Sequence, residues 1–303
     1  MKKTDRKIPG RPATLVSRRR VLTLASSALV LPTLGTSANA FSLWDRLWDR
    51  RRPLAGIQLY TLRTAMKNDV PGTLGQVAKI GYKEVEFAGY FGHSPAEIKK
   101  MVSDLGMTAP SSHIQVADVQ ANPKAVIDAA LTAGHQFVVI AWFPPEKRKT
   151  LDQWKGWTDV LNGFATQCHG AGLRFCYHNH FFEFLPIDGV LPYDILLENT
   201  DKKTVEFELD MYWAASVGVD LGNLLAKNRG RIPLCHVKDM TGSGAMTDIG
   251  EGTIDFARLF ARPDIAPFEH YFYENDDTTT PLESAAISYK ALTAILEKLP
   301  ARA

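Results

Sequence analysis

The chain has 303 residues, of which 45% are apolar, and a formal net charge of +2. This length suits one large domain or two ordinary ones, and the apolar fraction supports a substantial core. Eight of the 35 Lys and Arg residues but only one of the 33 acids lie in residues 1–40, so residues 41–303 hold 27 bases against 32 acids. Nucleic-acid binders usually carry a basic surface, and this acidic balance therefore argues against a nucleic-acid partner.

The N-terminus carries the three parts of an export signal. A twin-arginine pattern at 17–22 precedes the apolar run 21–34, and the small residues of 38–40 form a cleavage site. This order predicts a Tat-type signal peptide over 1–40, a periplasmic or secreted protein, and no membrane attachment after cleavage. The alternative is an uncleaved anchor or a disordered tail. A linker is predicted over 41–53.

After the linker, short β-branched runs alternate with amphipathic stretches of helical period. Strands are predicted at 55–60, 83–87, 107–113, 136–141, 173–178, 204–210, 232–238 and 269–274. Helices are predicted at about 70–80, 94–105, 122–133, 150–170, 190–199, 219–227, 254–261 and 281–298. Glycines directly follow several of these helices, as is typical of helix C-termini.

Eight strand–helix pairs match a (β/α)8 TIM barrel in number and in size, and the barrel is predicted over 54–300. A doubly wound sheet is the alternative. It would need a phosphate-binding glycine loop after the first strand, and residues 60–64 contain no glycine. In a barrel the active site lies at the carboxyl ends of the strands, so the strand ends become the candidate site.

Titratable side chains follow seven of the eight predicted strands. The candidates are Glu86, His113, His178, His180, Glu183, Asp210, His236, Lys238 and Glu274. A mouth ringed by His, Asp and Glu suits a divalent metal with nitrogen and oxygen ligands, and it leaves groups for proton transfer. Each residue alone also has a structural interpretation: Glu86 as a salt-bridge partner, Asp210 as a helix N-cap and His236 as a core histidine.

Three acids, Glu206, Glu208 and Asp210, alternate along the sixth predicted strand and would share one face. Three inward acids are too many for a barrel core unless they have partners. Either Glu206 lies at the solvated start of the strand, or Glu208 pairs with a base such as Lys238. The sequence leaves both alternatives open.

The ordered motifs of the chain resemble the sugar phosphate isomerase/epimerase family, which belongs to the xylose isomerase-like TIM barrels. They are GIQLY (56–60), GYKEVE (81–86), YHNH (177–180), LDMYW (209–213), HVKD (236–239), IGEG (249–252) and YEND (273–276). The resemblance implies one divalent metal, manganese first and Mg, Co, Zn or Fe as alternatives, held by His178, Asp210, His236 and Glu274. Relatives carry glutamate at the first position, so His178, His180 or Glu183 is predicted to supply that ligand.

We predict metal-assisted enolisation of a small carbohydrate, either a keto-sugar or a glycoside. A base among His180, Glu183, His113 and Glu86 removes the α-proton, and Lys238 stabilises the oxyanion. Reprotonation gives an isomerase or epimerase, whereas loss of a β-leaving group gives a lyase or hydrolase acting on a 3-keto-glycoside. The alternatives from other classes are a nuclease like endonuclease IV and a non-catalytic sugar-binding barrel. The sequence does not decide whether the chain forms a homodimer.

Overall fold

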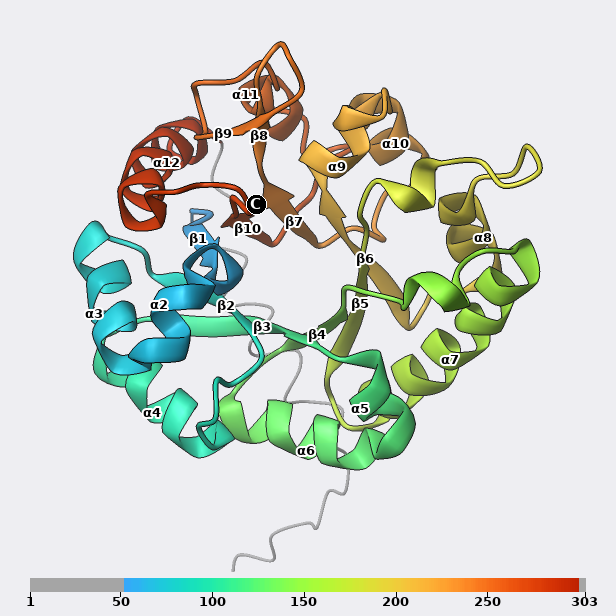
Figure 1. Ribbon diagram of the computed structural model, residues 1–303, viewed down its shortest axis with the longest axis horizontal. Helices are drawn as coiled ribbons and strands as arrows, with labels where there is room; N and C mark the ends of the chain where they lie inside the picture. Colours follow the sequence, from blue (N-terminus) through green and yellow to red (C-terminus); the bar gives the residue numbers. More distant parts are fainter. Residues whose placement is uncertain (1–51, 300–303) are drawn as a thin grey trace, which may run out of the picture. The chain divides into compact units, whose positions relative to one another are not determined.

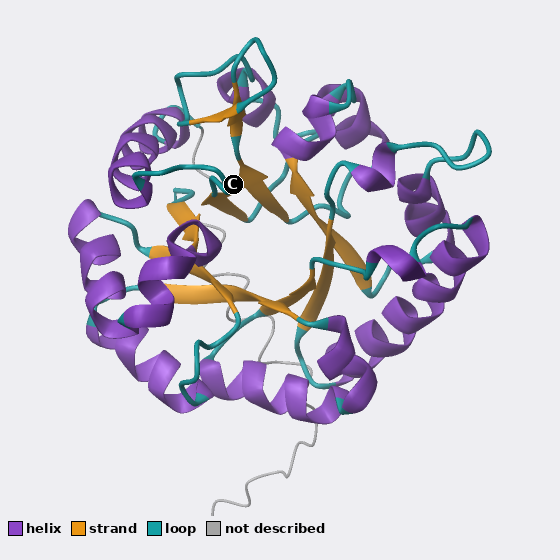
Figure 2. Cartoon of the chain, in the orientation of Figure 1, coloured by secondary structure: helices purple, strands orange, loops and turns teal. Residues whose placement is uncertain are grey.

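The computed structural model describes residues 52–299. The predicted signal peptide over 1–40 and most of the predicted linker over 41–53 therefore lie outside the described residues. The described chain forms a closed barrel of eight parallel strands in the order β1-β10-β7-β6-β5-β4-β3-β2 (Figure 1). The strands make the inner ring and the helices the outer one (Figure 2), so the predicted (β/α)8 TIM barrel is confirmed.

Each predicted strand and helix overlaps an observed one. The barrel strands are β1 (Ala55–Gln58), β2 (Glu84–Ala88), β3 (Thr108–Ile114), β4 (Phe137–Ile140), β5 (Arg174–His178), β6 (Val205–Asp210), β7 (Leu234–Val237) and β10 (His270–Tyr273). The outer helices are α3 (Val70–Ile80), α4 (Pro95–Asp104), α6 (Pro123–Ala133), α7 (Leu151–Gly170), α8 (Pro192–Asn199), α10 (Leu221–Lys227), α11 (Phe256–Phe260) and α12 (Pro281–Leu296). None of the helices in 52–299 combines the length and the apolar character needed to cross a membrane.

Short elements that the periodicity did not predict build up the mouth of the barrel. They are η1 (Leu59–Leu62), α2 (Arg63–Asn68), α5 (Val116–Ala121), η2 (Pro145–Lys147), η3 (Phe182–Phe184), α9 (Met211–Ser216) and the hairpin of β8 (Asp239–Met240) and β9 (Met246–Thr247). The first strand is two residues shorter than predicted because the Gln58 side chain accepts a hydrogen bond from Tyr60 N at 3.0 Å and starts η1 there. A side-chain cap of this kind satisfies a donor that a new helix leaves free.

The interior of the barrel is layered along its axis. Phe137, Val139, Cys176, Leu234 and Phe272 form an apolar cluster separate from the larger core between strands and helices. Successive inward side chains on one strand are two residues apart, so on β5 the inward Cys176 lies between Arg174 and His178. On β5 this apolar cluster thus lies between a polar side chain at the amino end of the strand and another at its carboxyl end.

The amino-end layer accounts for one of the three acids on β6. Arg174 donates two hydrogen bonds to Glu206, at 2.8 and 2.6 Å, and a third to Glu269 at 2.7 Å. The Glu206 side chain is 18% exposed. The first of the two sequence-based alternatives therefore holds: Glu206 lies at the start of the strand, away from the carboxyl-end residues.

Candidate active site

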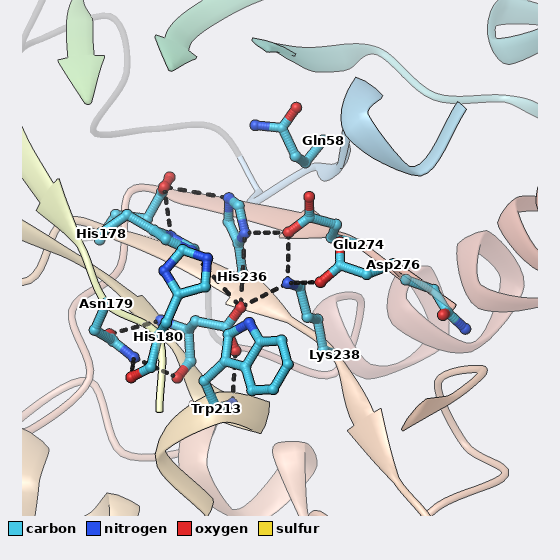
Figure 3. Close-up of polar contacts among 12 residues, drawn as sticks. Gln58, His178, Asn179, His180, Trp213, His236, Lys238, Glu274 and Asp276 are labelled. Atoms are coloured by element: carbon cyan, nitrogen blue, oxygen red, sulfur yellow. Dashed lines mark hydrogen bonds and ion pairs between the residues drawn. The ribbon is translucent and has the colours of Figure 1, made fainter. Parts of the chain in front are cut away.

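Titratable side chains from the carboxyl ends of six strands contact one another at one end of the barrel. Figure 3 shows His178, His236, Lys238, Glu274 and Asp276 among them. We call this group the mouth cluster, and its members are Glu86, His113, His178, Glu208, Asp210, His236, Lys238, Glu274 and Asp276. Their side chains are at most 5% exposed, apart from His113 at 13% and Asp276 at 21%. Most of the titratable side chains predicted at the strand ends therefore lie together, and they are largely buried.

The register of the parallel strands sets this arrangement. His178 on β5 is the Cα partner of Glu208 on β6, and Asp210 on β6 is the partner of His236 on β7. Inward side chains of neighbouring strands at one level lie within contact distance. A chain with acids and histidines at inward positions near its strand ends must therefore pack them against one another.

His236 lies at the centre of the mouth cluster. Its Nε2 is 2.7 Å from Glu86 Oε2 and 3.2 Å from Glu208 Oε2, and its Nδ1 is 2.8 Å from Glu274 Oε2. Burial alone would lower the pKa of His236. The charges of Glu208 and Glu274 and the hydrogen bonds outweigh burial and raise that pKa well above its usual value.

Glu208 pairs with histidines and not with Lys238, which corrects the second sequence-based alternative. Its Oε2 lies 2.7 Å from His113 Nε2 and 3.1 Å from His178 Nδ1. Burial disfavours the charged carboxylate, but His236 and His113 reverse that effect and hold the pKa of Glu208 well below its usual range. The charges of Glu86 and Glu208 outweigh the burial of His113 and raise its pKa to about 9.

Lys238 is a buried cation held by three carboxylates. Its Nζ lies 2.9 Å from Asp210 Oδ2, 2.7 Å from Glu274 Oε2 and 2.8 Å from Asp276 Oδ2. Burial favours the neutral amine, yet the charges of Asp210 and Glu274 outweigh it and raise the pKa of Lys238 well above normal. Lys238 therefore keeps its charge inside the site, as the predicted oxyanion-stabilising role requires.

Asp210 is both an N-cap and a member of the mouth cluster. Its Oδ1 accepts a hydrogen bond from Trp213 N at 2.9 Å and so starts α9, which leaves Oδ2 to face Lys238. Asn179 fixes the peptide before this helix, because its side chain donates to Asp210 O at 3.2 Å and accepts from Asp210 N at 3.1 Å. Asn179 thus ties the end of β5 to the end of β6, a role that its place between two histidines did not reveal.

Glu183 is not brought to the mouth cluster, and its predicted role as an acid, a base or a first ligand is not supported. Its Oε1 accepts a hydrogen bond from Tyr177 OH at 2.6 Å, and its Oε2 accepts one from His180 N at 2.8 Å. Tyr177 packs in the outer core, where its ring stacks on Phe143. Glu183 therefore anchors the loop after β5, and burial raises its pKa to about 7.

The raised pKa of Glu183 predicts a pH-dependent stability. Its usual value is 4.5, so between about pH 4.5 and 7 the folded chain holds a proton that the unfolded chain releases. The free energy of unfolding should therefore fall as pH rises through this window, by about 3 kcal/mol in total. Glu183→Gln should lack this loss, because a glutamine can still bond Tyr177 and His180 N without ionising. Urea unfolding of both proteins with chelator at pH 5 and pH 8 tests this, and parallel pH profiles would contradict it.

His180 lies at the rim of the mouth among aromatic rings. Its ring stacks on Phe182 at 5.3 Å between centroids, meets Trp142 edge-on at 5.3 Å and lies 5.9 Å from Trp213. Its Nδ1 is a buried atom without a hydrogen-bond partner among the described residues. Burial lowers the pKa of His180 well below its usual value, so the imidazole is neutral at pH 7.

The mouth cluster fits a divalent metal ion. Two groups that share His236 offer ligand atoms within 4.8 Å of one another: Asp210, His236 and Glu274, and His113, His178, Glu208 and His236. The site has five carboxyl groups against Lys238 and three imidazoles, so a bound dication would offset an acidic excess. Glu208 Oε1 is also buried without a hydrogen-bond partner in the described chain. Mixed imidazole and carboxylate donors suit Mn, Fe, Co or Zn.

Comparison with known proteins gives relatives of one kind. No protein-family profile matches the chain. An inosose dehydratase of Geobacillus kaustophilus is 23% identical over 249 residues, which cover 65% of this chain and 79% of that protein. An inosose dehydratase of Geobacillus thermodenitrificans is 28% identical over 141 residues, which cover 41% of this chain and 47% of that protein.

Solved structures share the barrel. A sugar phosphate isomerase/epimerase from Parabacteroides distasonis has a TM-score of 0.69 and 25% identity over 80% of this chain and 94% of its own. A zinc-bound IolI protein has a TM-score of 0.65 and 16% identity over 82% of this chain and 99% of its own.

These neighbours, which also include a xylose isomerase domain protein at 13% identity and a TM-score of 0.64, share the TIM-barrel fold with this chain. The resemblance to the sugar phosphate isomerase/epimerase family that the motifs indicated is confirmed.

Proposed function

We propose that this chain is a divalent-metal-dependent enzyme that enolises a keto-sugar, as a sugar isomerase or epimerase. The observation that carries the proposal is the buried mouth cluster, where imidazoles and carboxylates converge at the catalytic end of a barrel. The names of its relatives support the same first step. They include an L-ribulose 3-epimerase and an inosose dehydratase, and both epimerisation beside a carbonyl and β-elimination can begin with loss of an α-proton.

Asp210, His236 and Glu274, with His178, are the residues proposed to hold the ion, manganese first among the candidates. When bound, a divalent ion supplies Lewis acidity that polarises a carbonyl and stabilises an enediolate. Lys238 adds a fixed positive charge beside the same carboxylates, so that negative charge developing on a substrate oxygen is stabilised without rearrangement.

The two histidines that flank His178 are suited to opposite proton-transfer roles. The ring centroids of His113 and His180 lie 5.0 and 5.1 Å from that of His178. The pKa of His113 is raised to about 9 by Glu86 and Glu208 against the effect of burial, whereas burial lowers the pKa of His180. We assign His180 as the base that removes the α-proton and His113 as the acid that returns one, because opposite pKa shifts separate these roles.

An aromatic wall beside His180 supports a carbohydrate as the substrate. Trp142 and Phe181 are 43% and 40% exposed, and both rings contact Phe182, at 5.3 and 5.7 Å between centroids. Binding sites for small molecules combine such aromatic surface with a few converging polar groups. A sugar ring stacked on Trp142 would lie beside His180, whose ring meets that of Trp142 at 5.3 Å between centroids.

Deuterium exchange tests the proposed function. Protein loaded with Mn²⁺ is incubated in D₂O with ketohexoses and with a 3-keto-glycoside, and the α-carbon is followed by NMR and mass spectrometry. Exchange should occur, and EDTA should abolish it until Mn²⁺ is restored. Exchange that continues unchanged in EDTA would contradict the proposal, and binding without exchange would indicate a non-catalytic sugar-binding barrel.

The same experiment separates the main proposal from a lyase or hydrolase acting on 3-keto-glycosides. The similarity to two inosose dehydratases favours elimination as this second candidate. An epimerase gives a sugar of unchanged mass apart from deuterium, whereas a lyase releases the leaving group of the glycoside. We further propose export through the Tat-type signal over 1–40, which sequencing the N-terminus of protein from a periplasmic fraction would test.

A further inference from the structure

Three ring nitrogens of the mouth cluster converge on a single carboxylate oxygen. Glu208 Oε2 lies 2.7 Å from His113 Nε2, 3.1 Å from His178 Nδ1 and 3.2 Å from His236 Nε2. The side chain of Glu208 is fully buried. The point where these nitrogens converge is therefore filled by the oxygen itself.

The opposite nitrogens of two of these rings face a different carboxylate. His178 Nε2 and His236 Nδ1 lie 3.8 and 4.0 Å from Asp210 Oδ2. Metal–ligand bonds of about 2.0–2.2 Å place two ligand atoms of one ion roughly 3–4 Å apart. These separations suit two ligands of one ion beside Asp210 Oδ2, which Lys238 Nζ also contacts at 2.9 Å. The nitrogens around Glu208 instead lie at hydrogen-bonding distance from its oxygen.

We propose that Glu208 is a positioning residue that decides which nitrogen each histidine presents to the metal. An ionised carboxylate only accepts hydrogen bonds, so the nitrogens that face Glu208 carry hydrogen. That leaves His178 Nε2 and His236 Nδ1 as the nitrogens on the side of Asp210 and Glu274, where His236 Nδ1 lies 2.8 Å from Glu274 Oε2. An ion shared with these two carboxylates would replace the proton in that contact. This inference rests on the proposed function, and it makes Glu208 an orienting partner and not a ligand.

A second carboxylate reinforces the orientation of His236. Glu86 Oε2 accepts from His236 Nε2 at 2.7 Å and from Gln58 Nε2 at 2.8 Å. The Ser111 hydroxyl donates to the other oxygen of Glu86. Glu86 is therefore held in place by two neighbouring strands, and His236 receives the same orientation from Glu86 and from Glu208. Such partners also raise the basicity of the ligand nitrogen.

Metal titration of Glu208→Gln tests the proposal. A glutamine keeps an acceptor oxygen but loses the charge, so the variant should still bind one ion per chain, with an affinity about 10–100-fold lower. Affinities for Mn²⁺ and Co²⁺ are measured by competition with a chelator, and the visible spectrum of the Co²⁺ form should keep its shape. Glu206→Gln is the matched control, since Glu206 is an inward acid on the same strand that contacts Arg174, and its metal affinity should stay within twofold of wild type.

Two further variants decide where the ion lies. Asp210→Asn should lose the ion, whereas His113→Gln should retain it, because the ion pairs of His113 are with the orienting carboxylates Glu86 and Glu208. In ¹⁵N NMR of the Zn²⁺-loaded protein, the bound nitrogens should be Nε2 of His178 and Nδ1 of His236. The proposal is overturned if Glu208→Gln binds as tightly as wild type, if His113→Gln loses the ion while Asp210→Asn keeps it, or if the bound nitrogens are reversed. A wild-type protein that binds no ion would instead refute the proposed function.

Discussion

His236→Ala should abolish turnover and metal binding together. We expect kcat/KM to fall by at least about 10³-fold and the bound metal to drop below one ion per ten chains. The physical reason is that His236 belongs to both candidate ligand groups and contacts Glu86, Glu208 and Glu274. Its removal takes away a ligand and leaves buried carboxylates facing one another, so repulsion adds to the lost coordination.

The measurement is kcat/KM by α-proton exchange, together with metal content after dialysis. His169→Ala is a suitable control, because His169 is an exposed residue of the last turn of α7 and should leave both quantities unchanged. His236→Gln provides a milder variant if the alanine protein does not fold. Full activity of His236→Ala or His236→Gln would exclude a central role for the His236 imidazole.

Lys238→Met should produce the largest loss of stability. The ammonium is the partner of three carboxylates and is only 2% exposed, so methionine would leave Asp210, Glu274 and Asp276 without their cation. Removing one member of a buried ion pair costs about 3–5 kcal/mol. We expect a destabilisation of this size in the metal-free protein at pH 7.5, and a loss of turnover even when metal is added.

The pH dependence gives this prediction a second test. Without Lys238 the carboxylates repel one another, which raises their pKa values and favours their protonated forms in the folded chain. The pKa of Asp276 is already raised to about 6 by burial and by Glu274. The stability of the variant should therefore fall as pH rises from 5 to 7.5, so that its difference from wild type is smaller at pH 5. Lys290→Met, at an exposed position of α12, is the control, and an equal loss at both pH values would contradict the argument.

The alternation of side chains along the strands was sufficient to predict most residues of the mouth cluster. A two-residue period places Glu86, His178, Asp210 and His236 on the inward face of their strands, and the barrel rule brings their ends together. Glu183, which lies just past a strand end, does not reach the mouth cluster. There the chain turns into η3, the period no longer applies, and the carboxylate packs against Tyr177.

Partners across the barrel were beyond the reach of the sequence. Nothing in the order of residues distinguishes Lys238 from a histidine as the neighbour of Glu208, because that choice depends on the shear of the closed sheet and on side-chain reach. In the structure Glu208 contacts three imidazoles, and Lys238 contacts Asp210, Glu274 and Asp276. The sequence analysis also missed Asp276 as a site residue. Asp276 follows the last barrel strand by three residues, where the two-residue alternation of side chains no longer applies.

The apolar cluster of Phe137, Val139, Cys176, Leu234 and Phe272 has a consequence for proton traffic. These side chains offer no chain of donors and acceptors along which a proton could pass towards Arg174 and Glu206 at the opposite end. In the proposed reaction, a proton taken from the substrate would therefore return to the solvent through the rim, past His113 and His180. A bound sugar that covers the rim would block this exit, so the proton removed from one carbon would stay inside the site and be available for return to the same molecule.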